Sequence, residues 1–243
     1  MNSKIFMQKK TKVTSELAEF VGIMLGDGCC HLKTYQITIS SGIIDGRYIS
    51  EHIPQMIKRL FSKNVRYRKQ VPGGIDCIFG SKQVCEMLRD NMNFVSPKTN
   101  CEIPKHFFEN NTLLKSCVKG LFDTDGGLHR HHKLSAQLKF TNKSHSLINS
   151  LYLALKKLGY NPCVTIDYKS KNTKAIYLFS KDVKKYFKEI CSNNPKNKLK
   201  YEQWIKNGIV PLNKDIEHEV KLTDSEQEML LGRKLIPLKV HKF

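Results

Sequence analysis

The chain has 243 residues, of which 40% are hydrophobic, so it can bury a substantial core in one large domain or in two closely joined halves. Its 41 Lys and Arg against 22 Asp and Glu give a net charge of +19, which favours nucleic acid as a partner, although solvated surface lysines give the same balance. The sequence has no apolar run of membrane-spanning length, no signal-peptide core and no C-x-x-C among its 8 cysteines, so a reducing, intracellular compartment is expected, an organelle included.

The first distinctive stretch is Leu17–Gly28, an apolar helical segment that ends in Asp27 and a glycine. Ala18, Gly22 and Gly26 recur at every fourth residue, so they share one face of the predicted helix. A glycine inside a helix costs about 1 kcal/mol relative to alanine. The stripe of small residues therefore predicts close packing against a second helix.

The rest of the first half alternates between strand and helix patterns. In His31–Ser40 apolar and polar residues alternate, which predicts one strand with a buried face and a polar face. Gln36, Thr38 and Ser40 lie on the polar face. The patterns that follow predict, in order, a helix at Asp45–Phe61, strands at Val65–Val71 and Ile75–Gly80, and a helix from Ser81 to about Asp90.

The second half begins with a similar helical stretch, Cys117–Gly127. Its small-residue stripe is Ser116, Gly120 and Thr124, and Asp125 precedes the glycine. A strand is expected in which Leu134, Ala136, Leu138 and Phe140 face inward, followed by a helix at Ser144–Leu158, a strand pair within Asn161–Phe179 and a helix at Lys181–Ile190.

The two halves keep a constant offset. Asp125 follows Asp27 by 98 residues, and Lys196 follows Lys98 by the same number, each lysine directly after a proline. A period of this size indicates a tandem duplication. Both halves therefore read as α-β-β-α-β-β-α, an α+β fold.

Asp27 and Asp125 are the candidate reactive groups. Each ends a helix, where the peptide dipoles place partial negative charge, so two carboxylates that converge there repel each other and need a cation. Carboxylates together with the terminal carbonyl oxygens of Gly26 and Thr124 suit Mg²⁺ or Mn²⁺. Such an ion activates water and stabilises phosphoryl transition states. A single Asp-Gly pair after a helix is an ordinary turn, but two copies behind the same stripe favour a metal site.

At these stretches the chain resembles the LAGLIDADG homing endonucleases. Phe20–Gly28 (FVGIMLGDG) and Val118–Gly126 (VKGLFDTDG) are both similar to the signature of that family, and its second acidic position falls on the two aspartates. The first copy departs from the signature, because Leu25 stands at the first acidic position, which Asp123 occupies in the second copy. That position is not the catalytic one in the family.

The resemblance implies two pseudo-symmetric αββαββα LAGLIDADG repeats, at residues 14–105 and 106–212, whose antiparallel sheets form a saddle over double-stranded DNA. Residues 213–243 are a C-terminal extension without an assigned role. The implied activity is that of an intron-encoded or intein-derived homing endonuclease. Such an enzyme makes a staggered double-strand cut in a long asymmetric site by divalent-metal-dependent hydrolysis. Because both signature helices lie in one chain, the active form is expected to be a monomer.

The resemblance also implies roles for side chains around the two aspartates. Lys98 and Lys196 are expected near the active centre, where a lysine stabilises a phosphate or polarises water, although each is equally explained as a solvated surface lysine. Auxiliary polar groups near the scissile phosphates fall on Asn142 and Lys143, and in the first half on Ser41. The side chains expected to face DNA are Gln36, Thr38, Ser40, Arg66, Arg68, Gln70, Gln137, Lys139 and Thr141.

Two functions from different classes remain open at this point. The first is the site-specific endonuclease, and the second is a binding protein on the same scaffold, either an intron RNA maturase acting on its cognate RNA or a protein that does not cut. The presence of both Asp27 and Asp125 favours catalysis, because a protein that only binds gains little from two carboxylates that repel each other.

Overall fold

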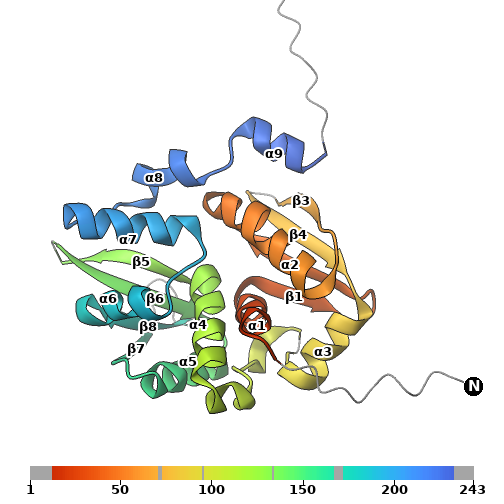
Figure 1. Ribbon diagram of the computed structural model, residues 1–243, viewed down its shortest axis with the longest axis horizontal. Coiled ribbons are helices and arrows are strands. Elements are labelled where there is room, and N and C mark those ends of the chain that lie inside the picture. Colours follow the sequence, from red (N-terminus) through yellow and green to blue (C-terminus); the bar gives the residue numbers. More distant parts are fainter. Residues whose placement is uncertain (1–12, 71–72, 95, 133, 167–171, 233–243) are drawn as a thin grey trace, which may run out of the picture.

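The computed structural model describes residues 13–70, 73–94, 96–132, 134–166 and 172–232, and within them two halves follow the same order of elements (Figure 1). The α+β fold with two αββαββα repeats is confirmed. The first half consists of α1 (Ser15–Asp27), β1 (Gly28–His31), β2 (Gln36–Ser41), α2 (Ile53–Phe61), β3 (Arg66–Gln70), β4 (Gly74–Gly80) and α3 (Lys82–Met92). The second consists of α4 (Asn111–Asp125), β5 (Gly126–His131), β6 (Ser135–Asn142), α5 (His145–Lys157), β7 (Cys163–Ile166), β8 (Lys174–Phe179) and α6 (Ser180–Glu189).

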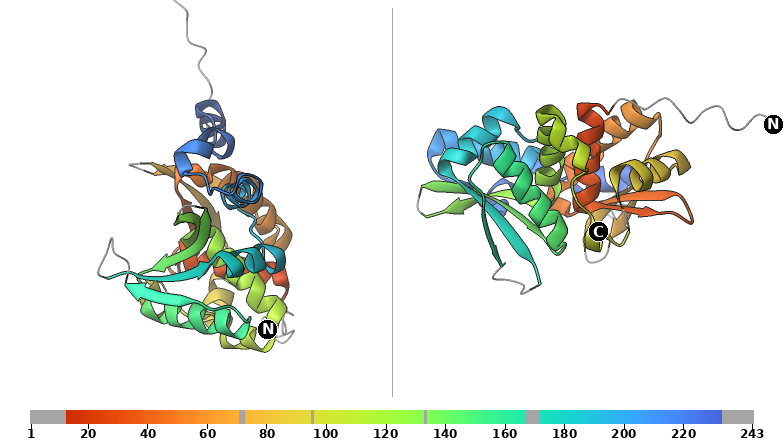
Figure 2. Two further views of the ribbon diagram at one scale, coloured as in Figure 1. Left: turned by 90° about the vertical axis from the view of Figure 1, so that its left-hand side faces the viewer. Right: turned by 90° about the horizontal axis from the view of Figure 1, so that it is seen from below.

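Helices α1 and α4 pack side by side at the centre of the molecule, between the two halves (Figures 1 and 2). The approach is close enough that a methyl group on Gly22 would overlap the carbonyl oxygen of Cys117, and one on Gly120 would overlap the carbonyl oxygen of Glu19. Ala18 is fully buried, and Ser116 is half-buried one turn before Gly120. The small-residue stripes therefore let the two helix backbones meet.

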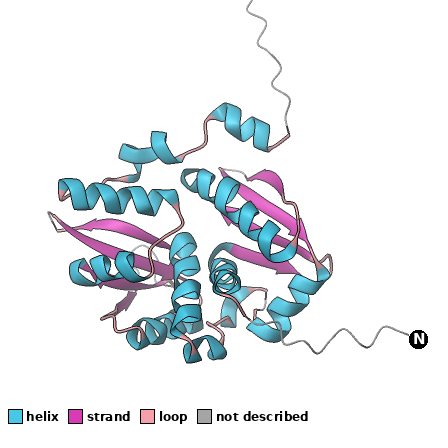
Figure 3. Ribbon diagram, viewed as in Figure 1, coloured by secondary structure: helices cyan, strands magenta, loops and turns pink. Residues whose placement is uncertain are grey.

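Each half contributes an antiparallel four-stranded sheet, with the order β1-β2-β4-β3 in the first and β5-β6-β8-β7 in the second. Figure 3 shows the two sheets on either side of the central helices. Alternate residues such as Ile37, Ile39, Leu138 and Phe140 are buried in the core, so the intervening polar residues lie on the opposite face of each sheet. This places one polar sheet face in each half.

The prediction of a single strand at His31–Ser40 is wrong. The segment contains the end of β1, a turn and then β2, and an equivalent hairpin joins β5 to β6. Strands β1 and β5 each begin directly after the helix that ends in aspartate, and their short Gly-, Cys- and His-containing sequences carry no clear alternation. Leu134 was expected to face inward but is 64% exposed, because it lies in the hairpin turn ahead of β6.

The predicted helix at Asp45–Phe61 is divided. A 3-10 turn (Ile43–Asp45) and a π-helical turn (Tyr48–His52) precede α2. Pro54 lies in the first turn of α2, directly after the π-helical turn, and its missing backbone N–H interrupts the regular hydrogen-bond ladder where the helix type changes. The division leaves Asp45 on a short connection close to the helix pair rather than inside a helix.

The C-terminal part of the described chain links the two halves. After α7 (Pro195–Asn207), the helices α8 (Asn213–Val220) and α9 (Asp224–Leu230) lie along one edge of both repeats (Figure 1). Leu222, between them, is buried, and a methyl group on Gly46 of the first repeat would lie 3.0 Å from its Cγ atom. Within the described residues, none of the helices is long and apolar enough to cross a membrane.

Candidate active site at the end of the helix pair

Asp27 and Asp125 are the last residues of α1 and α4, so the packing of the two helices brings both carboxylates to one end of the pair. Burial and repulsion by Asp125 raise the pKa of Asp27, and burial raises the pKa of Asp125. Both groups therefore bind a proton more readily than an exposed aspartate does. A bound cation would relieve the same repulsion, so the pair has the chemistry of a cation site.

Of the two backbone oxygens proposed as further metal ligands, that of Gly26 already accepts a hydrogen bond. The ammonium group of Lys98 donates a hydrogen bond to the carbonyl oxygen of Gly26 and lies 3.5 Å from that of Met24. The hydroxyl of Thr124 donates back to the carbonyl oxygen of Gly120 at 3.0 Å. Among the described residues, no group of three or more His, Cys, Asp or Glu side chains is arranged to hold a metal ion. A metal at this position would therefore take further ligands from water or phosphate, as Mg²⁺ commonly does.

Asn142 lies at the end of β6 and donates a hydrogen bond from its amide to Oδ2 of Asp125. Its own oxygen accepts from the backbone N–H of Ser144 at 2.7 Å, which fixes the amide between the aspartate and the start of α5. Asn142, Lys143 and Lys98 line one cavity of about 690 Å³. The structure therefore brings three of the sequence-predicted site residues together on one side of the aspartate pair.

Lys196 lies on the other side of the pair and forms an ion pair with Asp45, with 2.6 Å between Nζ and Oδ1. The amide of Asn194 donates to the same carboxylate oxygen, also at 2.6 Å. The negative charge of Asp45 contributes to the raised pKa of Asp27, which places this third carboxylate near the site. The sequence does not single out Asp45, because its pattern places this residue at the start of a helix and the equivalent position of the second repeat is not acidic.

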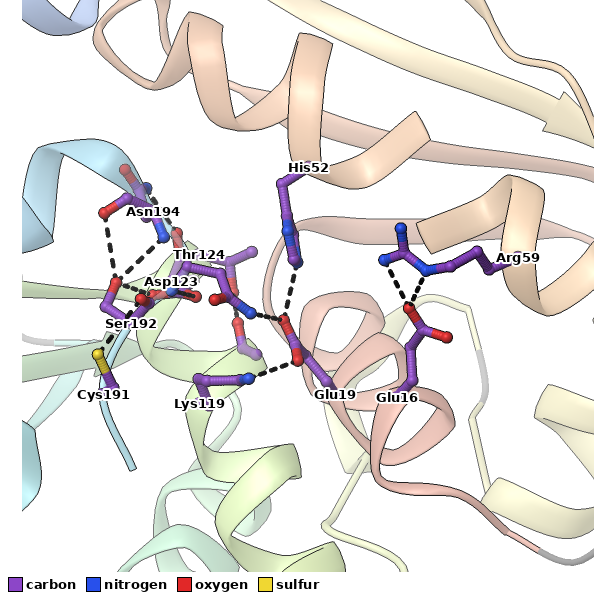
Figure 4. Close-up of polar contacts among 12 residues, drawn as sticks. Glu16, Glu19, His52, Arg59, Lys119, Asp123, Thr124, Cys191, Ser192 and Asn194 are labelled. Atoms are coloured by element: carbon purple, nitrogen blue, oxygen red, sulfur yellow. Dashed lines mark hydrogen bonds and ion pairs between the residues drawn. The ribbon is translucent and has the colours of Figure 1, made fainter. Parts of the chain in front are cut away.

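A buried polar network joins Asp123 of α4 to the segment at residues 192–194, which precedes Lys196 (Figure 4). Asp123 is 2% exposed and accepts hydrogen bonds from the hydroxyl of Ser192 and from the backbone N–H of Asn193. Its backbone carbonyl accepts from the side chain of Asn194, the residue that also contacts Asp45. The first acidic position of the second signature thus holds the segment that leads to Lys196.

Glu19, on α1, connects four parts of the chain (Figure 4). It is 5% exposed and accepts from His52 at 2.9 Å, from Lys119 at 2.7 Å and from Asn193 at 2.7 Å. Burial acts to raise the pKa of Glu19, but the hydrogen bond from His52 and the charge of Lys119 outweigh it, so the pKa is lowered. The ionised form is therefore the one that the fold stabilises.

Glu19→Gln is expected to lower the free energy of unfolding by about 3 kcal/mol at pH 7, because it removes the charged partner of the half-buried Lys119 from a buried hydrogen-bond network. A lowered carboxyl pKa stabilises the fold above the unfolded-state value of 4.5 and stops doing so as the pH falls below it. The difference between wild type and variant should therefore shrink toward pH 3.5 in denaturant unfolding curves. Glu86→Gln, which removes an exposed pair with Lys82, is the control and should cost less than about 0.5 kcal/mol. A Glu19 effect as small as the control's, or one independent of pH, would contradict this assignment.

The polar face of the first sheet is organised by Asp76, which is 1% exposed. Its carboxylate accepts from Ser40 at 2.8 Å, from Nη2 of Arg68 at 2.7 Å and from Gln70 at 2.5 Å. Three residues expected to face DNA are thus held in place by an acid that sequence reasoning did not single out. The guanidinium of Arg68 remains substantially exposed, with 63% of its side-chain surface accessible.

The remaining predicted DNA-facing residues differ between the sheets. Gln36 accepts a hydrogen bond from Arg66 at 3.1 Å, and its amide nitrogen lies 3.4 Å from the hydroxyl of Thr38, which is buried. In the second sheet Gln137, Lys139 and Thr141 are half-buried and alternate with the buried core residues of β6. The ammonium of Lys139 lies 5.8 Å from the centroid of the Tyr177 ring, which in turn stacks on Phe179. The two faces therefore present different chemistry.

Part of the sequence matches a known protein family. Residues 113–191, from α4 to just beyond α6, match the family model of the LAGLIDADG-like domain. The second half of the chain therefore contains a LAGLIDADG-like domain, which supports the resemblance to the LAGLIDADG family. A curated relative, the replication factor C small subunit of Methanocaldococcus jannaschii, is 23% identical over 164 residues, which are 67% of this chain. The chain matches only 8% of the length of that relative.

Solved structures of two homing endonucleases and of a LAGLIDADG domain are similar to most of this chain. The homing endonuclease I-DmoI in complex with DNA and Mn is 17% identical, with a TM-score of 0.53 over 73% of this chain and 96% of that one. I-WcaI, bound to its DNA recognition sequence, is 18% identical, with a TM-score of 0.55 over 82% of this chain and 92% of that one. The N-terminal LAGLIDADG domain of DUF199/WhiA is 17% identical, with a TM-score of 0.53 over 72% and 82% of the two chains. At these identities the likeness establishes the fold.

Proposed function

We propose that this LAGLIDADG protein is a site-specific endonuclease that makes a staggered double-strand cut in a long, asymmetric DNA target by divalent-metal-dependent hydrolysis. The observation that carries the proposal is the pair of half-buried carboxylates, Asp27 and Asp125, at the end of two packed helices. Burial raises the pKa of both groups, and repulsion by Asp125 also raises that of Asp27, so a bound cation would stabilise the ionised pair. Retained repulsion of this kind is typical of a functional site rather than of a structural one.

The two carboxylates would hold Mg²⁺ or Mn²⁺ jointly, with water and phosphate oxygens completing the coordination. The bound ion supplies a Lewis acid and a more acidic water molecule. The side chains around it have separate tasks. Lys98, Lys143 and Lys196 offer positive charge to the phosphates on either side of the cut, and Asn142 orients Asp125 through its amide.

The charge and the two sheet faces support duplex DNA as the partner. The chain carries a net charge of +19, and the two sheets present polar faces that include Arg66, Arg68 and Lys139. Since these faces differ, the two halves of a target should be read differently, which makes the target asymmetric. Repeats at 14–105 and 106–212 within one chain supply both signature helices, so the proposed active form is a monomer. The complexes of I-DmoI and I-WcaI with DNA support the same assignment.

The test is cleavage of a randomised duplex library with Mg²⁺, followed by sequencing of the ends. The expected result is a small set of related long sites that are cut on both strands, and no cutting without a divalent ion. The second candidate is a nucleic-acid-binding protein that does not cut, because the net charge of +19 favours binding without requiring cleavage. Selective binding of duplex DNA or of an intron RNA, without cleavage under any divalent ion, would reject the endonuclease in favour of that candidate.

The affinity for duplex DNA is expected to fall with salt at a log–log slope of about −0.9 for each phosphate neutralised. Lys139→Ala should reduce the magnitude of that slope by about 1, because Lys139 lies on the polar face of the second sheet. Lys58→Ala, on the exposed side of α2, is the control and should leave the slope unchanged. Fluorescence anisotropy over a series of salt concentrations measures both. A wild-type slope that corresponds to fewer than about two phosphates would be too small for an extended footprint.

A further inference from the structure

The two repeats can be compared position by position through their hairpins. Strand β1 pairs with β2, and β5 with β6, in the same register when each is counted from the glycine that follows the aspartate. By that count Ser41 corresponds to Asn142, and Asp45 corresponds to Ser146. The two lysines, Lys98 and Lys196, correspond through the offset of 98 residues. Equivalent loops therefore meet equivalent lysine segments on the two sides of the aspartate pair.

The contacts at these equivalent places differ in charge. On one side the carboxylate of Asp45 forms an ion pair with Lys196. On the other side Ser146 offers only a hydroxyl, which lies 3.4 Å from the carbonyl oxygen of Thr99, next to Lys98. Lys98 contacts the carbonyl oxygens at the end of α1 and borders the cavity of about 690 Å³. Lys196 is thus ion-paired with a carboxylate outside the aspartate pair, whereas the charge of Lys98 acts on Asp27 and Asp125 themselves, at the border of the cavity.

Asp45 is held in place from two directions. The amide of Asn194, itself fixed by the backbone of Asp123, donates to its carboxylate. On the opposite side α8 packs on the turn that contains Asp45, and Arg47 lies 3.6 Å from Glu226 of α9. The C-terminal extension therefore supports the loop that carries this carboxylate, and it has no equivalent beside Ser146 among the contacts of the described residues.

We propose that Asp45 is a positioning residue that holds Lys196 back from the DNA backbone and makes the two strand-cutting centres unequal. The inference rests on the proposed endonuclease function. A phosphate that approaches Lys196 must compete with Asp45, which is 2.6 Å from its ammonium group, whereas the carboxylates near Lys98 are Asp27 and Asp125, whose charge the proposed metal ion would neutralise. The strand served by Lys98 is therefore cut first, and the nicked duplex accumulates before the second cut.

The experiment measures the cutting rate of each strand separately, on a duplex that carries a different label at each end. Lys98→Met and Lys196→Met first identify which strand is cleaved more slowly when each lysine is removed. Asp45→Asn is then expected to raise the cleavage rate of the slower strand by about fivefold, which corresponds to the loss of one ion pair of modest strength. The cleavage rate of the faster strand should stay unchanged. Asp45→Glu keeps the charge and should keep the wild-type order. Ser146→Asp places a carboxylate beside Lys98 and should slow the strand that Lys98 serves.

A purely structural role of Asp45 would slow both strands together and would not be reversed by Asp45→Glu. That result would overturn the proposal. So would a wild-type protein in which the more slowly cleaved strand is the one whose cleavage depends on Lys98. If the wild-type protein binds DNA without cutting it, the proposed endonuclease function is wrong. The effect of Asp45 on Lys196 is then tested through the salt dependence of DNA binding. In that case Asp45→Asn should steepen the log–log salt dependence by about 0.9, since one more lysine reaches a phosphate. An unchanged slope would reject the restraint itself.

Discussion

Replacing Asp27 or Asp125 by Asn is expected to lower the cleavage rate of both strands by about a thousandfold, because each variant removes one of the two carboxylates proposed to hold the metal ion. The affinity for the uncut target should be kept or should increase, since a negative charge that faces the phosphates is lost. Cleavage is measured with labelled duplex under single-turnover conditions, and affinity with Ca²⁺ in place of Mg²⁺. Cutting of both strands by either variant at near the wild-type rate would eliminate the paired-carboxylate mechanism.

Thermal unfolding distinguishes a loss of cleavage caused by the missing carboxylate from one caused by misfolding of the variant. The folded protein raises the pKa of both aspartates, so each favours the fold only while protonated, and this contribution is lost as the pH rises through the raised pKa. Without metal, Asp27→Asn and Asp125→Asn should therefore melt at a higher temperature than wild type at pH 8. Asp90→Asn changes an exposed aspartate on α3 and should affect neither cleavage nor this comparison. A lower melting temperature in both Asn variants at pH 8 would show that the carboxylates are structural.

Gly120→Ala is expected to lower the free energy of unfolding by about 2 kcal/mol, and Gly120→Leu by more, because any β-carbon there overlaps the backbone of Glu19. Helix propensity alone predicts the opposite sign, since alanine in a helix is about 1 kcal/mol more favourable than glycine. Gly22→Ala should behave in the same way, because its added methyl group would overlap the backbone of Cys117. Denaturant unfolding curves measure the free energy of unfolding of all three variants.

Gly42→Ala provides the matched control. A β-carbon at Gly42 would meet no other atom within 4 Å, and its φ of −67° suits any residue. This variant should be neutral or slightly more stable than wild type. If Gly120→Ala were also neutral, the two helix backbones would have to be farther apart than the structure shows, and the small residues would need another explanation.

Much of the fold was readable from local patterns. The helices that end in Asp27 and Asp125, the duplication and the alternation in β6 depend on residues close together in the sequence, where periodicity and capping act directly. Strands β1 and β5 were missed because four to six residues that follow a helix carry too little pattern. Their pairing with β2 and β6, rather than their own composition, makes them strands.

The sequence by itself determined the paired aspartates, the stripes of Gly22 and Gly120, and the excess of basic residues, because each is a matter of residue identity and spacing. Only the tertiary structure decided which charges meet. The ion pair between Asp45 and Lys196 joins residues from different repeats. Lys98 and Lys143, which line the same cavity, also come from different repeats. Such contacts depend on how the two helices cross and how the loops fold back over their ends, and no local propensity encodes that geometry.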